Sequence, residues 1–354
     1  MRCEGFFANV GSGDGLESYH APLLTGLCAC SRPVVQSTFR MTGFGSAPTA
    51  SRGGKGRKQM PTCKKYLDAE AARILKACSG NVQLAQRHFM RRKFNQLREQ
   101  APDLYASLVL QQQEMLDGIR RRLSEPEREK LIELTWDVVA SFLPATVTPY
   151  GPTGEMKRRI NKIAKFVAVQ PKATPKGAAI LDVGCGDGSI LPFLRDVGCR
   201  DQDYLGIDLS STMIQTAARA FPHASFEHTS FAKFKAKKCA QQATCFGTVL
   251  FNGSLQFFDK PLDALSDAAA LLPRTREGPR RGRIVISHAQ GAAFVDQEKE
   301  GNPATVPSTL PDLSDLGAFA QDLNMKLSVP FQDGADAAST DAQLSSFYLV
   351  ALDA

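Results

Sequence analysis

Several features are absent from this sequence, and each absence excludes a class of protein. No run of apolar residues approaches the roughly 20 that a membrane-spanning helix needs, so no membrane span is expected. The nine cysteines are scattered and include no Cys-x-x-Cys pair, which argues against a zinc site. Cys28 and Cys30 lie too close together for such a pair, and Cys239 and Cys245 lie too far apart. We therefore expect no metal site and predict free thiols in a reducing compartment.

Acidic residues are missing from one long stretch near the N-terminus. No Asp or Glu occurs from Ser18 to Leu67, and residues 1–67 carry nine Lys and Arg against three Asp and Glu. Residues 155–354 carry 22 basic and 22 acidic residues, so the net charge of +7 is almost entirely N-terminal. An acid-poor N-terminus that bears Ser and Arg resembles an organelle transit peptide. This predicts a chloroplast or another organelle as the location, and otherwise the cytoplasm.

The same N-terminal segment is predicted to be disordered. Residues 1–61 contain Gly, Ser and Pro throughout and show no apolar periodicity. A basic arm that binds nucleic acid, or an ordinary disordered tail, are the alternatives to a transit peptide. Because residues 155–354 are neutral, nothing in them indicates a phosphate backbone as partner, and nucleic acid is not expected there.

Helical periodicity predicts an α-helical segment over residues 62–145. Ser124 to Glu127 form a capping-box pattern, which predicts the start of a helix that buries Leu131 and Val138. The segment is interpreted as a packing module, while a weak similarity of residues 75–97 to helix-turn-helix and ubiquitin-binding units leaves a docking role open. Three prolines within residues 144–153 mark the boundary to a second domain, predicted over residues 155–354.

Residues 180–190 are the most informative stretch of the chain. A short apolar strand pattern leads into a turn with Gly184, Gly186 and Gly188, and a helical pattern follows. Strand, glycine turn and helix form an arrangement in which backbone N–H groups can approach a cofactor closely. The glycines do not follow the dinucleotide spacing, because Ser189 stands where the third dinucleotide glycine would fall.

The pattern Asp-x-Gly-x-Gly-x-Gly, beginning at Asp182, resembles motif I of the class I S-adenosylmethionine-dependent methyltransferases. A second strand over residues 204–208 ends in Asp208, whose carboxylate can accept two hydrogen bonds from a ribose diol. Residues 246–251 and 283–288 read as further parallel strands, and residues 326–331 and 347–352 as a closing antiparallel pair. The resemblance implies an α/β fold with a doubly wound, seven-stranded Rossmann-like methyltransferase sheet behind the N-terminal helical segment.

The resemblance also implies S-adenosylmethionine as the cofactor. The residues that it places at the cofactor are Asp182, Gly184, Gly186, Gly188, Asp208, Leu209, Met213, Thr229, Ser230 and Asn252. The family often has an acid just beyond the third strand to meet the adenine amino group, whereas this chain has His228, Thr229 and Ser230. A hydroxyl or a backbone carbonyl must therefore make that contact if it exists. Residues 286–291 and 306–311 look similar to a plastid-type group of methyltransferase-domain proteins of plants and algae.

Two residues at the ends of later strands are the candidate catalytic residues. His288 ends the fifth strand and has a side chain whose usual pKa, near 6.5, suits proton acceptance. Asn252 ends the fourth strand and offers an amide group. The alternatives are a structural, hydrogen-bonded histidine and a turn-forming asparagine. Methyl transfer from a sulfonium needs a base only if the acceptor must lose a proton, so positioning of the acceptor does most of the work.

These patterns predict a methyltransferase that acts on a small-molecule acceptor. One alternative is a methyltransferase for RNA or protein that uses the helical segment for docking. The other is a non-catalytic protein that keeps the cofactor fold and acts through partners. The sequence names neither the acceptor nor the oligomeric state.

A chain that begins near Pro61 should fold and bind S-adenosylmethionine as the full chain does. The reason is that the first 60 residues lack the apolar periodicity needed to join a core. Thermal unfolding and calorimetric titration of the shortened and the full chain measure this. Lost solubility or lost binding in the shortened chain would show that the segment is structural.

Overall fold

The computed structural model describes residues 69–116, 123–142, 154–169, 179–240, 246–273, 280–330 and 337–354. The segment 1–61, predicted to be disordered and to act as a transit peptide, lies outside the described residues. Within the described part, no helix is both long and apolar enough to cross a membrane.

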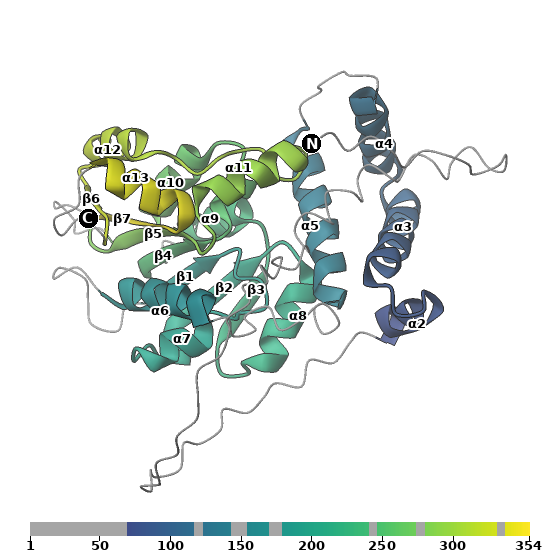
Figure 1. Cartoon of the computed structure of the whole chain (residues 1–354), viewed down its shortest axis with the longest axis horizontal. Helices are drawn as coiled ribbons and strands as arrows, with labels where there is room; N and C mark the ends of the chain where they lie inside the picture. The colour runs from purple at the N-terminus through teal and green to yellow at the C-terminus, as the bar shows by residue number, and fades with distance from the viewer. Residues whose placement is uncertain are drawn as a thin grey trace, which may run out of the picture.

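A seven-stranded sheet with the order β3-β2-β1-β4-β5-β7-β6 forms the centre of the C-terminal part (Figure 1). Strands β1 to β5 pair in parallel, and β7 runs antiparallel to both β5 and β6. The strands are β1 (Ala179–Val183), β2 (Tyr204–Asp208), β3 (Ser225–His228), β4 (Phe246–Asn252), β5 (Arg283–His288), β6 (Lys326–Ser328) and β7 (Tyr348–Asp353). The predicted doubly wound α/β sheet with its closing antiparallel pair is confirmed.

Both faces of this sheet are covered by helices, which explains why its central strands carry buried apolar residues toward both faces. In β4, Val249 and Phe251 belong to the core on one face, while Leu250 belongs to the core on the other. The helices of the C-terminal part are α6 (Gly154–Ala168), α7 (Leu191–Asp196), α8 (Ser211–Ala220), α9 (Phe231–Ala240), α10 (Pro261–Ala270), α11 (Ala292–Gly301), α12 (Leu313–Asp322) and α13 (Ala337–Ser346). Helices α6 and α7 pack on one face, and α9, α10 and α12 on the other.

The predicted N-terminal helical segment forms a core of its own. Its helices are α2 (Ala69–Ala77), α3 (Val82–Gln100), α4 (Pro102–Leu116) and α5 (Glu125–Phe142). Leu131 and Val138 of α5 are buried in that core, as the periodicity predicted, and so is Phe142. The glutamate half of the capping box is also present, because the backbone N–H of Ser124 donates to a carboxylate oxygen of Glu127 at 2.7 Å. Helix α5 stands between the sheet and helices α3 and α4 (Figure 1).

The last strands and helices differ from the sequence prediction. Strand β6 was expected over residues 326–331 but ends at Ser328. Pro330 has no N–H for a ladder hydrogen bond, which is a physical reason for the early end. Helices α11 and α13 were not predicted. In α13 the reason is that the helix is rich in Ser, Thr and Asp and shows weak helical periodicity. The two helices pack against each other, so tertiary contacts stabilise what local sequence does not.

Candidate active site

The turn after β1 is built from glycines in the left-handed region of backbone conformation. Gly184, Gly186 and Gly188 have φ of 74°, 55° and 73°. These values favour glycine because a side chain there would clash with the backbone. The N–H groups of Gly184 and Cys185 donate to the carbonyl oxygen of Ile207 at 2.8 and 3.0 Å, which ties the turn to β2.

The three glycines have different surroundings. A Cβ on Gly184 would lie 2.5 Å from the Cβ of Ser254, so the close approach of the loop after β4 requires glycine. A Cβ on Gly188 would lie 3.1 Å from the ring of Phe221, so this position is closed by packing. A Cβ on Gly186 would meet no atom within 4 Å. Of the three, Gly186 is the glycine whose side-chain position is open space.

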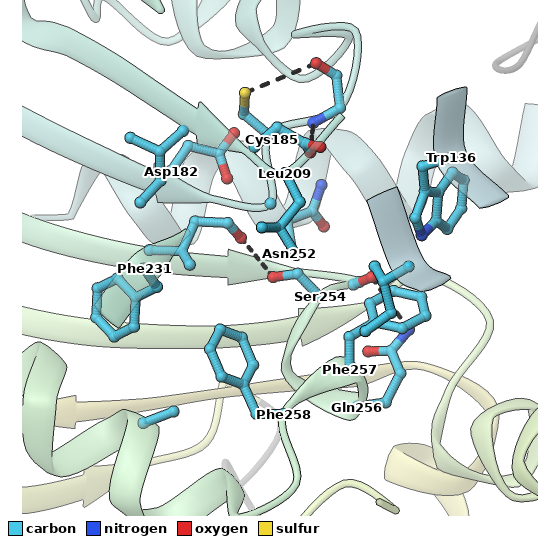
Figure 2. A pocket seen from close by; sticks show the side chains of 18 of the residues that line it. Trp136, Asp182, Cys185, Leu209, Phe231, Asn252, Ser254, Gln256, Phe257 and Phe258 are labelled. Atoms are coloured by element: carbon cyan, nitrogen blue, oxygen red, sulfur yellow. Dashed lines mark hydrogen bonds between the residues drawn. The ribbon is translucent and has the colours of Figure 1, made fainter. Parts of the chain in front are cut away.

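A cavity of about 860 Å³ opens at the carboxyl ends of the parallel strands, within the size range of ligand sites (Figure 2). The predicted site residues that line it are Asp182, Gly184, Gly186, Asp208, Leu209, Met213, Thr229, Ser230, Asn252 and His288. The exception is Gly188, which is not among the lining residues. Parallel strands end on the same edge of a sheet, which is why residues from β1, β2, β4 and β5 meet here.

Asp208 is held by backbone groups at the end of β2. Its two carboxylate oxygens accept from the N–H of Gly186 at 2.9 Å and from the N–H of Ser210 at 2.8 Å. A carboxylate has about four acceptor positions, so two remain for a ligand. Burial raises the pKa of Asp208 to about 6, although both N–H groups act in the opposite direction.

Asp182 is the most deeply buried carboxylate of the cavity, with a side chain that is 1% exposed. The hydroxyl of Tyr204 donates to one of its oxygens at 2.6 Å. The other oxygen, Oδ1, has no hydrogen-bond partner among the described residues. Burial raises the pKa of Asp182 to about 7, because the charged form loses its hydration. A ligand that donates a hydrogen bond or carries positive charge would stabilise this carboxylate.

The predicted cofactor residues after β2 and β3 are fixed by local hydrogen bonds. The backbone N–H of Thr229 donates to the carbonyl oxygen of Asp208 at 3.0 Å, which joins the two loops. A ring nitrogen of His228 lies 2.8 Å from the carbonyl oxygen of Leu209. The hydroxyl of Ser210 accepts from the N–H of Met213 at 3.1 Å and so caps α8. Ser230 is buried at the start of α9.

Asn252 and the loop after it connect three strands. The hydroxyl of Ser287 in β5 donates to the amide oxygen of Asn252 at 2.9 Å, which fixes the orientation of this amide. The hydroxyl of Ser254 donates to the carbonyl oxygen of Val183 at the end of β1. The loop after β4 is thereby held to its neighbours on both sides.

His288 lines the cavity but is mostly covered. Its side chain is 7% exposed, and its ring stacks on Phe294 of α11 with ring centroids 5.6 Å apart. Burial lowers the pKa of His288 to about 4. The sequence suggested a value near 6.5, and the difference arises because burial disfavours the charged ring. His288 is therefore neutral at physiological pH.

Part of the cavity wall comes from α5, which the sequence analysis had not assigned to the site. Arg128, Glu129, Ile132 and Trp136 line the cavity. The rings of Trp136 and Phe257 meet edge to face with centroids 5.7 Å apart. Helical spacing places these four residues on a face of α5 away from the buried core positions. An apolar pair at positions 132 and 136 on that second face was the signal available in the sequence.

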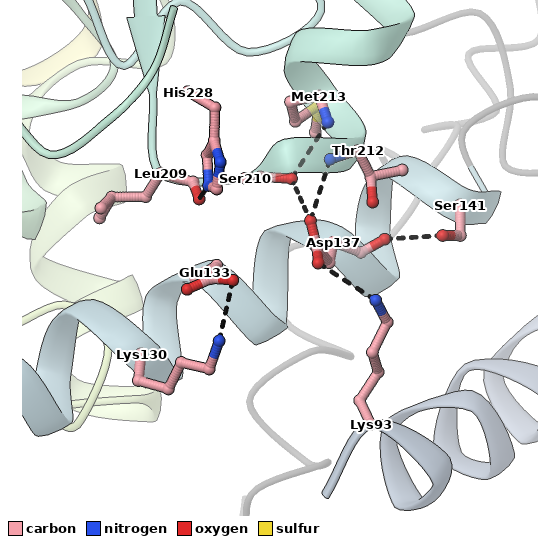
Figure 3. Close-up of polar contacts among 10 residues, drawn as sticks. All are labelled: Lys93, Lys130, Glu133, Asp137, Ser141, Leu209, Ser210, Thr212, Met213 and His228. Atoms are coloured by element: carbon pink, nitrogen blue, oxygen red, sulfur yellow. Dashed lines mark hydrogen bonds and ion pairs between the residues drawn. The ribbon is translucent and has the colours of Figure 1, made fainter. Parts of the chain in front are cut away.

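A buried carboxylate connects α5 to the loop after β2 (Figure 3). One oxygen of Asp137 accepts from the hydroxyl of Ser210 at 2.6 Å and from the N–H of Thr212 at 3.1 Å. The other accepts from the ammonium of Lys93 in α3 at 3.2 Å. Burial alone would raise the pKa of Asp137, but the hydrogen bond from Ser210, the charge of Lys93 and the contacts with Thr212 together hold it below its usual value. Asp137 is therefore ionised and joins the helical segment to the cavity.

No group of three or more His, Cys, Asp or Glu that could hold a metal ion occurs in the part of the chain that the structure describes. The cavity instead combines buried carboxylates, open backbone at Gly186 and aromatic walls. Such an arrangement can bind a polar ligand along β1 and β2 and a second molecule beside β4, β5 and α5.

Residues 155–315 match the family model of a methyltransferase domain. This region includes the glycine turn and the strands β1 to β5 but leaves out α5. No curated protein matches the chain. The match and the strand order agree with a methyltransferase domain and support S-adenosylmethionine as its cofactor.

Solved structures similar to this chain are distant. A chain of the complex between the Haloferax volcanii Trm112 methyltransferase activator and the putative methyltransferase is 16% identical, with 62% of this chain and 97% of that chain covered and a TM-score of 0.42. The plantazolicin methyltransferase BpumL in complex with SAH is 16% identical, with 64% and 98% covered and a TM-score of 0.39. A SAM-dependent methyltransferase from Archaeoglobus fulgidus is 11% identical, with 56% and 94% covered and a TM-score of 0.38. Likeness at this level supports no conclusion about substrate or partner.

Replacing Asp137 with Ala should weaken both the fold and cofactor binding. The change leaves the buried hydroxyl of Ser210 and the ammonium of Lys93 without their acceptor, which costs about 1–3 kcal/mol of stability. It also loosens the loop that presents Asp208. Chemical unfolding and calorimetric titration with S-adenosylmethionine measure the two effects.

Ser141→Ala is the matched control, because Ser141 is buried in the same helix and donates only to the carbonyl oxygen of Asp137. It should leave cofactor affinity unchanged. Wild-type affinity in a folded Asp137→Ala variant would show that α5 does not position the loop.

Proposed function

We propose that this protein is an S-adenosylmethionine-dependent methyltransferase that acts on a small-molecule acceptor. The observation that supports this most is one cavity that joins the glycine turn and both strand-end acids, Asp182 and Asp208, to Asn252 and His288. When bound, S-adenosylmethionine supplies a methyl group on a positively charged sulfur. The match of residues 155–315 to a methyltransferase domain agrees with this chemistry.

The residues along β1 and β2 suit the cofactor. Gly186 leaves open space beside the strand ends, so a ligand can approach its backbone. The free acceptor positions of Asp208 fit a ribose diol. Asp182 offers an acceptor oxygen that is buried and has no partner in the described chain. These acceptors are complementary to a cofactor that carries donors and net positive charge.

The residues along β4, β5 and α5 suit the acceptor. Trp136 and Phe257 form apolar walls, and the amide of Asn252 is fixed by Ser287. Neutral His288 can accept a hydrogen bond or a proton from an acceptor group. In-line positioning of the acceptor by such walls supplies most of what methyl transfer requires.

The position of α5 favours a small molecule over RNA or protein as the acceptor. One face of α5 is buried in the helical core, and another lines the cavity. Because one face of α5 packs in the helical core and another lines the cavity, less of its surface remains free to dock an RNA or a protein. The neutral charge of residues 155–354 also does not favour RNA.

We also propose that residues 1–61 direct the protein to a chloroplast or another organelle. The support is the acid-poor, basic composition of this stretch and the resemblance to a plastid-type group. A fusion of residues 1–60 to a fluorescent reporter tests the address, and a reporter that stays in the cytoplasm would contradict it.

Asp208→Ala should weaken S-adenosylmethionine binding by about 1–3 kcal/mol, the scale of hydrogen bonds to a charged group. Gly186→Val should weaken it further, because a side chain would enter the open space of the cavity. Calorimetric titration measures both. Gly198→Val is the control, because Gly198 has a φ of 93° and open surroundings but does not line the cavity. It should lose stability and keep affinity, whereas unchanged affinity in folded Asp208→Ala would refute the ribose role.

His288→Ala should leave cofactor affinity nearly intact and reduce turnover. If His288 is a general base, the loss should be roughly 10²-fold or more. Because the pKa of His288 is about 4, its protonation should reduce wild-type turnover at saturating cofactor only as the pH approaches 4. Protonation of Asp182 and Asp208, with pKa values of about 7 and 6, should weaken cofactor binding at higher pH. Release of S-adenosylhomocysteine, with an acceptor found by screening, measures turnover.

His288→Gln separates the two roles of this residue. Gln keeps a hydrogen-bonding amide but cannot take up a proton at these pH values. Activity near the wild-type level in this variant would show that His288 positions the acceptor and does not act as a base.

A further inference from the structure

We propose that the methyl acceptor carries a positively charged nitrogen group beside an apolar, flat part, and that it binds between α5 and the loop after β4. This inference rests on the proposed function and names the chemical class of its substrate. Three independent features of the cavity point to it: its charge, a buried acceptor without a partner, and its aromatic walls.

The first feature is an excess of carboxylates. The acidic residues that line the cavity are Glu125, Glu129, Asp182, Asp187, Asp208, Asp259, Asp263, Asp267 and Glu298. The basic residues that line it are Arg128 and Lys260. Both lie near carboxylates of the same lining, Arg128 at 3.7 Å from Asp259 and Lys260 at 3.7 Å from Asp263. The cavity therefore has a negative potential that attracts cations and repels anions.

The carboxylates belong to two groups of elements. Asp182, Asp187 and Asp208 belong to the glycine turn and the end of β2, where the cofactor is proposed to bind. Glu129 of α5 and Glu298 of α11 line the same cavity, together with the acids after β4. Some acids of this second group are ion-paired, among them Asp267 with Lys235 at 2.7 Å, but acids still outnumber bases in the lining. A cationic acceptor would offset the remaining negative charge.

The second feature is the amide oxygen of Gln256. Gln256 lines the cavity, its side chain is 2% exposed, and its Oε1 has no hydrogen-bond partner among the described residues. Its amide nitrogen donates to the carbonyl oxygen of Gly253 at 3.0 Å, which fixes the amide. Buried acceptors without a partner are rare, because each one costs free energy. A ligand that brings a donor to this oxygen would remove that cost.

The third feature is the pair of aromatic rings. Trp136 of α5 is half-buried and meets Phe257 edge to face, and both line the cavity close to Gln256 (Figure 2). The face of an indole attracts cations as well as flat apolar groups. Charge, hydrogen bonding and ring contacts therefore favour the same ligand, a protonated amine on an apolar frame. An alcohol could also donate a hydrogen bond to Gln256. Only a protonated amine also carries the positive charge that the carboxylates attract.

Trp136 provides the measurement, because it is the single tryptophan of the chain. The probes are phenethylamine, 2-phenylethanol and 3-phenylpropionate, which share a phenyl ring and differ in charge. They are titrated into the full-length protein saturated with S-adenosylhomocysteine, and Trp136 fluorescence reports their binding. Phenethylamine should bind roughly tenfold more tightly than 2-phenylethanol, because several carboxylates act together, and 3-phenylpropionate should bind most weakly. Added salt should reduce the preference for the amine.

Two variants assign the preference to residues. Glu129→Gln should weaken phenethylamine severalfold and leave 2-phenylethanol unchanged, because only the charge is removed. Its matched control is Glu133→Gln, one turn along α5, since Glu133 pairs with Lys130 at 2.9 Å and does not line the cavity. Gln256→Met should weaken both donor-bearing probes about fivefold or more, because it removes the acceptor and keeps the length of the side chain.

Equal binding of the amine and the alcohol, or tighter binding of the carboxylate, would overturn the inference. An equal effect of Glu129→Gln and Glu133→Gln would do the same. Calorimetry with S-adenosylmethionine distinguishes failure of this inference from failure of the proposed function. A protein that binds the cofactor without preferring amines refutes only the substrate class, whereas a protein that does not bind the cofactor refutes the methyltransferase proposal.

Discussion

The close approach of the glycine turn to the loop after β4 is the constraint on which the site depends. Gly184 can lie against Ser254 only because it has no Cβ, and Ser254 in turn donates to the carbonyl oxygen of Val183. The same turn donates two N–H groups to Ile207 of β2. Strands β1, β2 and β4 are thus joined at one point, and the cavity opens beside it. A side chain at Gly184 would separate these strands and remove the geometry of the cavity.

Burial of carboxylates at this point has an energetic consequence. Burial raises the pKa of Asp182 to about 7 and of Asp208 to about 6. At pH values between the usual pKa of an aspartate and these raised pKa values, the folded chain binds more protons than the unfolded chain. The stability that these two groups contribute is therefore present at low pH and lost as the pH rises through about 7. The cofactor-free protein carries this cost at neutral pH, and a ligand with positive charge and donors would offset it.

The helical segment belongs to the site although it lies outside the matched methyltransferase region. Asp137 joins α5 to Ser210 and Thr212, next to Asp208, while Lys93 joins α5 to α3. Trp136 of the same helix lines the cavity. The geometry of the loop after β2 and the shape of the cavity beside β4 therefore depend on one helix. One face of α5 packs in the helical core and the other lines the cavity. Residues 123–142 therefore complete the cavity of a domain that begins later in the chain.

The sequence determined the sheet, the glycine turn and the strand-end residues, because apolar strands, glycines at positive φ and acids at strand ends follow from local rules. It also determined that α5 is a helix and which of its residues reach a core. Only the tertiary structure decided that the other face of α5 closes the cavity, that Gly188 packs on Phe221, and that the pKa of His288 is lowered. These depend on burial and on contacts between distant segments. Periodicity shows which face of a helix is apolar, but the partner that covers it is set by the packing of the whole chain.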